Sequence, residues 1–474
     1  MRKNKYSTLF SNVYLFAIGE LITKLITFIL IPLYTSYMGT GDYGIGDLIV
    51  STIALLIPLM TFASTDVVLQ FSLDDEVDKT ELLRIIFKRI IISVLILAIP
   101  VYFILLKYNL NYLFIIVIFI YLFTALRSNL LQFSKGIDKT NAYVISSITT
   151  SVLLLLLNIL FICFLKLKVI GFLLSIAISE TVGFIILFII AGIKNYLSFK
   201  KSTKSKLKKE TLTYGLPLVP NKVFWWITNL SDRYMLVFFV GTSISGIYTA
   251  ASKLPNIYNV FINIFMQAWT ISAIKEKNDS EKEKFYGKIF NYFQLFSMVL
   301  GSFIILNINI IGTILYKKEF VASVDVIPII LLGIIYNSFG YFFGSILLAF
   351  RESKIIFKTT MFGAIFNIVF NIIFIKYLGM YGAAISTLIS YVLIMIIRYV
   401  YTKHFVKLHI SFKKMIIGTI IIFTQFVFLL FKVKYSYFIN LALFILYMGI
   451  NYSDLLLLIN FFIDKFIRKK KITV

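Results

Sequence analysis

The sequence predicts an all-α integral membrane protein with about fourteen transmembrane helices. Hydrophobic residues make up 59% of the 474 residues, against about 45–50% in ordinary globular proteins. The mean hydropathy is +0.91. Apolar runs of roughly 20 residues recur along the chain, and each is long enough to cross a hydrocarbon core about 30 Å thick. Because backbone groups inside a bilayer must pair within their own segment, these runs are predicted to be helices.

The apolar runs define fourteen predicted helices joined by short connections. Their ranges are 11–38, 43–69, 84–106, 110–133, 142–165, 169–193, 214–240, 244–273, 285–307, 324–350, 355–378, 380–402, 412–431 and 435–463. The longest break is a basic stretch between helices six and seven. The predicted domains are an N-terminal lobe (1–193), a basic cytoplasmic linker (194–213), a C-terminal lobe (214–402), and a final helix pair with a basic tail (403–474).

Lysine and arginine indicate the side that each connection faces, because cytoplasmic connections retain them. With the N-terminus inside, 35 of the 47 basic residues fall on the cytoplasmic side and 8 on the outer side. The remaining four are assigned to helix interiors: Lys24, Lys222, Arg233 and Lys253. We therefore expect both termini to be cytoplasmic. The net charge of +25 is then mainly a topology signal, and no nucleic-acid partner is expected because the charge is spread over many connections.

The sequence lacks the motifs that several classes of chemistry require. Cys163 is the single cysteine, so no disulfide can form within the chain. His404 and His409 share one connection far from Cys163 in sequence, and we see no metal-ligand constellation. There is no Walker loop and no dinucleotide fingerprint after a strand. We therefore expect no cofactor and no metal, and energy for any transport must come from gradients or coupled reactions.

Two pairs of matching segments indicate an internal repeat. The segment from Gly39 to Gly44 matches the segment from Gly241 to Gly246 at an offset of 202 residues. The segment 158–162 matches 371–375 at an offset of 213. Six helices separate the copies, so both copies have the same orientation. This predicts two six-helix lobes related by a pseudo-twofold axis along the membrane normal, with helices thirteen and fourteen as an appended pair.

Polar residues inside predicted helices are the candidate functional residues, because such groups rarely face lipid. They form stripes on helices one, two, seven and eight, which are equivalent pairs under the repeat, so we expect a water-filled cavity between the lobes. The candidate cavity-lining residues are Lys24, Lys222, Trp226, Asn229, Arg233, Lys253, Asn256, Asn263 and Gln267. The candidate ion-coupling or pairing residues are Glu20, Asp47, Asp66, Glu180 and Asp232.

The acidic residues also have structural interpretations. Glu20 and Lys24 stand four residues apart and could neutralise each other. Asp42 and Asp47 are expected to cap the start of helix two. Asp232 is adjacent to Arg233 and could hold that side chain in place.

Two segments carry the most distinctive sequence motifs. One runs from Lys24 through Pro32-Leu33-Tyr34 to Gly44, and the other is Ser231-Asp232-Arg233-Tyr234 followed by Gly246-Ile247-Tyr248 and Lys253. They resemble the polysaccharide-transporter branch of the multidrug/oligosaccharidyl-lipid/polysaccharide (MOP) exporter superfamily, the O-antigen or capsule repeat-unit flippases. The resemblance implies alternating-access translocation of an undecaprenyl-pyrophosphate-linked oligosaccharide across a bacterial cytoplasmic membrane, without enzymatic chemistry. It places Lys24, Arg233 and Lys253 near the cavity.

The same resemblance implies membrane lipids, a polysaccharide polymerase and chain-length machinery as further partners. The appended helix pair departs from the twelve helices of many members and resembles the fourteen-helix peptidoglycan-precursor flippases. Two alternatives stay open. A multidrug exporter of the same superfamily would be expected to have a carboxylate-rich cavity, and a membrane polymerase or glycosyltransferase would need a larger outer loop than roughly 17 residues.

Overall fold

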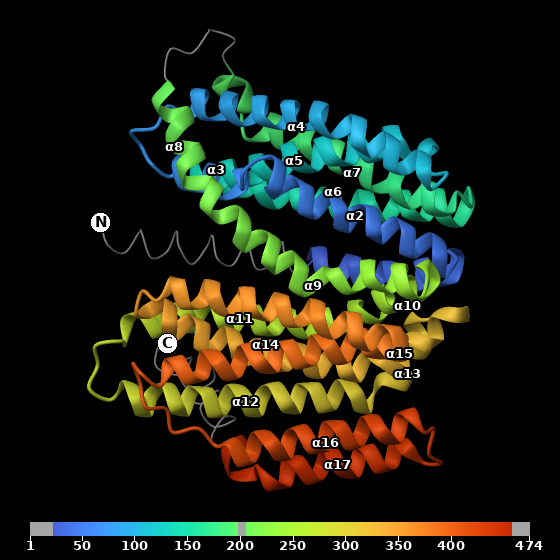
Figure 1. The fold of residues 1–474 in the computed structure, drawn as a ribbon, viewed down its shortest axis with the longest axis vertical. Coiled ribbons are helices and arrows are strands. Elements are labelled where there is room, and N and C mark those ends of the chain that lie inside the picture. Colours follow the sequence, from blue (N-terminus) through green and yellow to red (C-terminus); the bar gives the residue numbers. More distant parts are fainter. Residues whose placement is uncertain (1–21, 198–204, 457–474) are drawn as a thin grey trace, which may run out of the picture. The chain divides into compact units, whose positions relative to one another are not determined.

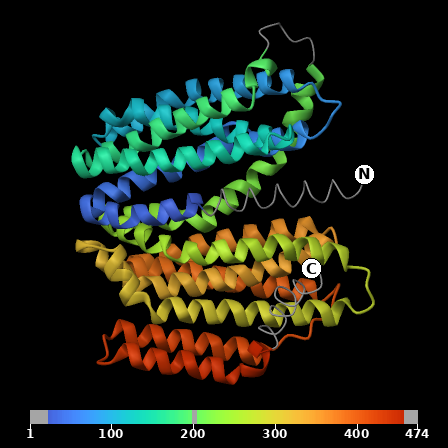
Figure 2. The same cartoon turned by 180° about the vertical axis from the view of Figure 1, so that it is seen from behind.

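The structure is a computed structural model that describes residues 22–197 and 205–456, and every regular element in these ranges is a helix. Figure 1 and the reverse view in Figure 2 show long helices packed side by side. The chain divides into two compact units, Met1–Thr249 and Ala250–Val474. Each unit is described below by itself.

The described part of the first unit starts with a short apolar helix, Ile22–Tyr37. Its other α-helices are α2 (Thr40–Met60), α3 (Ser64–Ser72), α4 (Lys79–Lys107), α5 (Phe114–Gly136), α6 (Thr140–Asn158), α7 (Lys168–Ile190), α8 (Ser205–Gly215), α9 (Val219–Phe239) and the greater part of α10 (Thr242–Lys253). A π-helical stretch, Ile159–Phe164, extends α6. The helix α7 packs against both α5 and α6, and α9 packs against α2.

The second unit contains the remaining helices, which are α11 (Pro255–Lys275), α12 (Lys282–Leu306), α13 (Ile308–Leu315), α14 (Ser323–Ala349), α15 (Ser353–Thr402), α16 (Phe412–Leu430) and α17 (Ser436–Ile450). The helix α14 lies against α11 and α15, and α16 and α17 lie beside α12 (Figure 1). Aromatic stacking fills its centre: the rings of Trp269 and Phe342 lie 4.1 Å apart and nearly parallel, and Phe290 and Phe293 pack around them.

The number of helices agrees with the predicted fourteen. Ten described helices are long and apolar enough to cross a membrane, and two shorter apolar helices, Ile22–Tyr37 and Ser436–Ile450, add to them. The helix α15 counts twice, because Gly379 has φ +56° and separates two helical halves. The helix α9 has the length of a span but is absent from the ten, and it carries the charged residues Lys222, Asp232 and Arg233. The predicted fold class is confirmed.

Two predicted helices are each broken in two. The predicted helix 43–69 ends at Met60, and Phe62 and Ala63 adopt positive φ values before α3 begins. The predicted helix 244–273 is interrupted at Leu254, before Pro255, which has no N–H to continue the helical hydrogen bonds. The polar stripes predicted for helices two and eight are therefore not continuous stripes on one helix.

The first predicted repeat appears as a close, symmetric contact between the starts of α2 and α10. A Cβ atom on Gly44 would lie 2.3 Å from the carbonyl oxygen of Thr242, and one on Gly246 would lie 2.0 Å from that of Thr40. Each of these pairs exchanges under the 202-residue offset, and the same offset relates Gly44 to Gly246. The two copies of the motif thus meet at a local pseudo-twofold axis, where only glycine permits the approach.

The second repeat is also visible in the packing. Gly171 lies against Phe161, and Gly382 lies against the backbone of Phe374. Phe161 and Phe374 are related by the 213-residue offset. A glycine therefore packs against the related phenylalanine in both copies, although the two glycines are 211 rather than 213 residues apart.

The compact units divide the chain after Thr249, whereas the predicted lobes are divided by the linker 194–213. The difference has a physical origin in α9, which the repeat assigns to the second lobe but which packs on α2 of the first unit. The lobe boundaries remain a prediction.

Gly44→Ala and Gly246→Ala should each lower the stability of the purified protein by about 1–3 kcal/mol, the usual cost of overpacking. The added methyl group would meet backbone oxygen, which cannot turn aside. Gly449→Ala in α17 is the matched control, since no atom lies within 4 Å of the position that its methyl group would take. Thermal unfolding in detergent measures the effect, and equal tolerance at all three glycines would contradict the close contact.

Candidate functional site: a buried ion pair beside the repeat contact

A buried ion pair joins α9 to α2 next to the glycine contact. Nη1 of Arg233 lies 2.5 Å from Oδ2 of Asp47, and the two side chains are 11% and 9% exposed. The same nitrogen donates to the hydroxyl of Ser51 at 3.1 Å. Thr249 donates to Oδ2 of Asp47 at 3.2 Å. Asp47 and Thr249 are themselves related by the 202-residue offset, so the pair lies on the repeat contact.

The expected capping role of Asp47 is wrong. The helix α2 starts at Thr40 with Gly39 as its N-cap, and no side chain caps it by a hydrogen bond. Asp47 lies two turns inside the helix and is buried. Asp42 lies in the first turn, where its charge favours the helix dipole without serving as the N-cap.

Hydrogen bonds on both sides hold Arg233 in position. Ser245 donates to the carbonyl oxygen of Arg233 at 3.1 Å, which ties α10 to α9. Tyr248 donates to Oδ2 of Asp232 at 2.7 Å, so the neighbouring carboxylate has a partner on α10. Together these contacts fix α9 between α2 and α10.

Residues of α9 on both sides of Arg233 in sequence make further polar contacts, two of them with α2. Nε1 of Trp226 donates to the carbonyl oxygen of Ser51 at 2.8 Å. The hydroxyl of Tyr234 lies 2.5 Å from that of Thr52. The amide of Asn229 donates to the carbonyl oxygen of Trp225 within its own helix at 2.6 Å.

A second ion pair lies nearer the start of α9. Nζ of Lys222 lies 3.0 Å from Oδ2 of Asp66 in α3. The two side chains are 40% and 36% exposed. The break between α2 and α3 therefore brings Asp66 to Lys222, and the pair is much more accessible than that of Arg233.

Most of the other predicted residues that the structure describes are exposed. Lys24 is exposed on the first described helix, and Asn256 and Asn263 are exposed on α11. Asn256 accepts a hydrogen bond from Asn259. Lys253 is half-buried at the end of α10. Glu20 and the side chain of Gln267 lie outside the described part of the chain.

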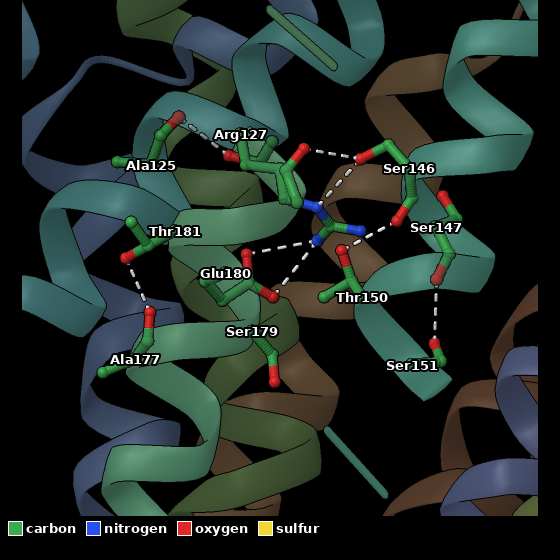
Figure 3. A network of polar contacts seen from close by, with 12 residues as sticks. Ala125, Arg127, Ser146, Ser147, Thr150, Ser151, Ala177, Ser179, Glu180 and Thr181 are labelled. Carbon is green, nitrogen blue, oxygen red and sulfur yellow. Dashed lines mark hydrogen bonds and ion pairs between the residues drawn. The ribbon is translucent and has the colours of Figure 1, made fainter. Parts of the chain in front are cut away.

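Glu180 belongs to a separate polar network within the first unit, shown in Figure 3. Nη1 of Arg127 in α5 lies 3.1 Å from both oxygens of Glu180 in α7. Nε of Arg127 faces the hydroxyl of Ser146 in α6, and that hydroxyl donates to the carbonyl oxygen of Gly183 at 2.9 Å. A Cβ atom on Gly183 would lie 2.7 Å from Nε of Arg127, so this glycine makes room for the guanidinium.

Arg398 forms a comparable cluster in the second unit. Nε donates to Thr359 at 3.1 Å, Nη2 donates to Thr360 at 3.0 Å, and Nη1 donates to the carbonyl oxygen of Gly340 at 3.1 Å. The residue is only 4% exposed. Within the described ranges, no carboxylate forms an ion pair with it.

Sequence reasoning missed both arginines by counting only four basic residues inside helices. Arg127 and Arg398 lie within α5 and α15. The 213-residue offset that relates the second repeat also relates Ser146 to Thr359 and Ser147 to Thr360. The hydroxyl pairs at equivalent positions were therefore the available signal for two guanidinium sites inside helices.

Among the described residues, no group of three or more His, Cys, Asp and Glu side chains could hold a metal ion. The first unit offers instead two ion pairs of very different exposure on one helix, α9. One pair is buried and fixes helix packing, and the other is accessible to a ligand.

Asp47→Ala should destabilise the protein far more than Asp66→Ala. The first change leaves Arg233 charged and buried without its carboxylate, which costs about 3–5 kcal/mol. The second breaks a largely exposed pair, for which about 0–1 kcal/mol is usual. Thermal unfolding of the two variants in the same detergent compares them, and similar losses would show that the buried pair is not a principal contact.

Comparison with known proteins places these features in a family. The profile of a family described as polysaccharide biosynthesis protein matches residues 9–271, more than half of the chain. No curated protein sequence matches.

Solved structures share the fold at low sequence identity. The structure of the lipid II flippase MurJ in an inward closed conformation has a TM-score of 0.69 at 16% identity, covering 94% of this chain and 100% of that one. An inward-facing multidrug resistance MATE family transporter of the MOP superfamily has a TM-score of 0.64 at 15% identity, covering 82% and 97%. The MATE transporter VcmN of Vibrio cholerae has 0.60 at 12%, covering 84% and 96%.

The family match and the shared fold agree with the long apolar helices described above. The chain therefore belongs to the polysaccharide biosynthesis protein family and is a multi-pass membrane protein that shares its fold with a lipid II flippase and with MATE transporters.

Proposed function

We propose that this protein is a flippase that moves an undecaprenyl-pyrophosphate-linked oligosaccharide from the cytoplasmic to the outer leaflet of a bacterial cytoplasmic membrane. The family match over residues 9–271 carries the proposal, because it links the chain to polysaccharide biosynthesis. The fold shared with a lipid II flippase supports it. The product would supply capsule, exopolysaccharide or O-antigen-type synthesis, with a polymerase and chain-length machinery as partners.

The physical task of such a flippase is to replace water around a sugar headgroup. Burying hydroxyls without partners costs several kcal/mol even for a few groups. Alternating access would open a polar cavity first to the cytoplasmic side and then to the outer side, while the lipid tail stays in the bilayer. Helices that carry Lys24, Lys222, Trp226, Asn229 and Lys253 are the proposed cavity walls.

Basic side chains in this set suit the pyrophosphate. Lys24 is exposed, and Lys222 keeps 40% exposure beside Asp66. A lysine ammonium offers three donors to phosphate oxygens and has no fixed geometry to satisfy. Arg233 has a different proposed role, because its charge is directed at Asp47: it positions α9, and through it Lys222, for the substrate.

A multidrug exporter is the second candidate, since MATE transporters share the fold. Such an exporter of cations would be expected to present carboxylates to its substrate. In the first unit, however, Asp47 and Asp66 are already paired with Arg233 and Lys222. Efflux of a cationic dye from vesicles distinguishes the two functions directly.

Lys24→Ala and Lys222→Ala should each slow flipping by about tenfold, the effect of losing one hydrogen bond to a charged group. Lys107→Ala, at the far end of α4, is the control and should transport normally. The assay is transfer of a lipid-linked oligosaccharide to the outer leaflet of vesicles, normalised to protein in the membrane. Normal transport by both cavity variants would remove their proposed contact with phosphate.

A membrane potential that is negative inside should speed net outward transfer. Each negative charge moved across the membrane gains about 2.3 kcal/mol per 100 mV. Vesicles with an imposed potassium diffusion potential of either sign measure this, at a constant substrate gradient. An unchanged rate on reversing the sign would mean that another driving force is used, or that compensating charge moves with the headgroup.

A further inference from the structure

A basic pocket lies at one end of the second unit, where α12 and α16 begin. Its volume is about 290 Å³. Its lining includes Lys284, Lys288, Tyr292, His409, Lys414 and Asp454. Three lysines therefore face one carboxylate, and that carboxylate forms an ion pair with Lys414.

The pocket wall is a fixed part of the fold. The side-chain amide of Asn291 in α12 donates to the carbonyl oxygen of His409 at 3.1 Å and accepts from the backbone N–H of Ser411 at 3.0 Å. A Cβ atom on Gly287 would lie only 3.0 Å from the carbonyl oxygen of His409. The connection between α15 and α16 is thus held closely against α12.

Two of the three lysines of α12, Lys284 and Lys288, line the pocket, and the nearby acidic groups have other partners. Glu283 accepts a hydrogen bond from the backbone N–H of Lys407 at 3.1 Å, and Asp454 is engaged by Lys414. Among the described residues, no carboxylate forms an ion pair with Lys284 or Lys288. The N-terminal ends of α12 and α16 add the positive ends of two helix dipoles.

The face of α12 that carries Lys288 and Tyr292 becomes apolar further along the helix. Lys288, Tyr292, Phe296 and Phe303 follow one another at steps of four, four and seven residues, so they share one helix face. Phe296 and Phe303 are 44% and 51% exposed. A basic recess at the end of an apolar span, joined to an exposed apolar face, matches the two halves of a lipid.

We propose that this pocket binds the phosphate of an anionic lipid in the cytoplasmic leaflet, with the lipid tail along the Phe296 face of α12. The start of α12 lies on the cytoplasmic side in the topology that the basic residues predict. The proposal does not depend on which substrate is transported, since a membrane phospholipid and a polyprenyl pyrophosphate present the same chemistry. It gives the appended helices α16 and α17 a role in completing a lipid site.

The test compares two double variants of the full-length protein in lipid nanodiscs. Lys284→Gln/Lys288→Gln changes the pocket, and Lys317→Gln/Lys318→Gln removes the same charge from another exposed pair in the second unit. Binding of phosphatidylglycerol, of a sugar-free polyprenyl pyrophosphate and of inorganic phosphate is measured separately. We expect the pocket variant to bind phosphatidylglycerol at least about tenfold more weakly, while the control binds normally.

The arms separate the possible results. Weaker binding of phosphatidylglycerol in the pocket variant alone supports the site with a membrane phospholipid as the occupant. Weaker binding of polyprenyl pyrophosphate alone supports the site with that lipid as the occupant. Equal loss of lipid binding in both double variants would mean bulk charge attraction and would overturn the proposal. A change confined to the binding of inorganic phosphate, or no change for any of the three ligands, would also overturn it.

Phe296→Ser tests the tail separately. This substitution should weaken the binding of a long-chain phosphatidylglycerol but leave the binding of a short-chain, water-soluble analogue unchanged. Ile310→Ser, on an exposed position of α13, is the control. If Phe296→Ser weakened the binding of both lipids, packing of α12 would be disturbed. If it weakened the binding of neither, the proposed path of the lipid tail would be wrong.

Discussion

The ion pair between Arg233 and Asp47 is the constraint on which the arrangement of the first unit depends. An arginine stays charged even when buried, so the guanidinium of α9 needs compensating partners at this position, and here a carboxylate is the principal one. Asp47 is that carboxylate, and it is placed where α2 and α10 approach through Gly44 and Gly246. The closeness of the glycine contact and the buried charge therefore require each other: a wider gap would admit water, and a misplaced carboxylate would leave the guanidinium without compensation.

The sequence predicted the fold better than it predicted the contacts. Hydropathy, charge bias and repeated glycine motifs depend on composition and local spacing, and they located the helices and the repeat. The pairing of Asp47 with Arg233 joins residues 186 positions apart, and no local pattern specifies it. The break after Met60 was hidden for a related reason, since Phe62 and Ala63 are apolar residues in a left-handed conformation that their chemistry does not signal.

The two arginines inside helices outside this site, Arg127 and Arg398, show how the two copies of the repeat differ. Nε of each arginine donates to a hydroxyl group at an equivalent position, that of Ser146 or Thr359. The arginines themselves come from non-equivalent positions in α5 and α15. Glu180 neutralises Arg127, whereas three neutral oxygens surround Arg398. The hydroxyl positions are thus shared while the charge balance is not, which gives each unit its own local field despite the common sequence pattern.

The unequal exposure of the two ion pairs on α9 bears on how a charged headgroup could pass. A phosphate that takes Lys222 from Asp66 displaces a contact worth about 0–1 kcal/mol, because water already screens that pair. A phosphate that takes Arg233 from Asp47 would leave a buried carboxylate behind, at about 3–5 kcal/mol. A carrier must bind and release its substrate in each cycle, so the weak pair is the better place for exchange. Under the proposed function, the strong pair would keep α9, and with it Lys222, in position during this exchange.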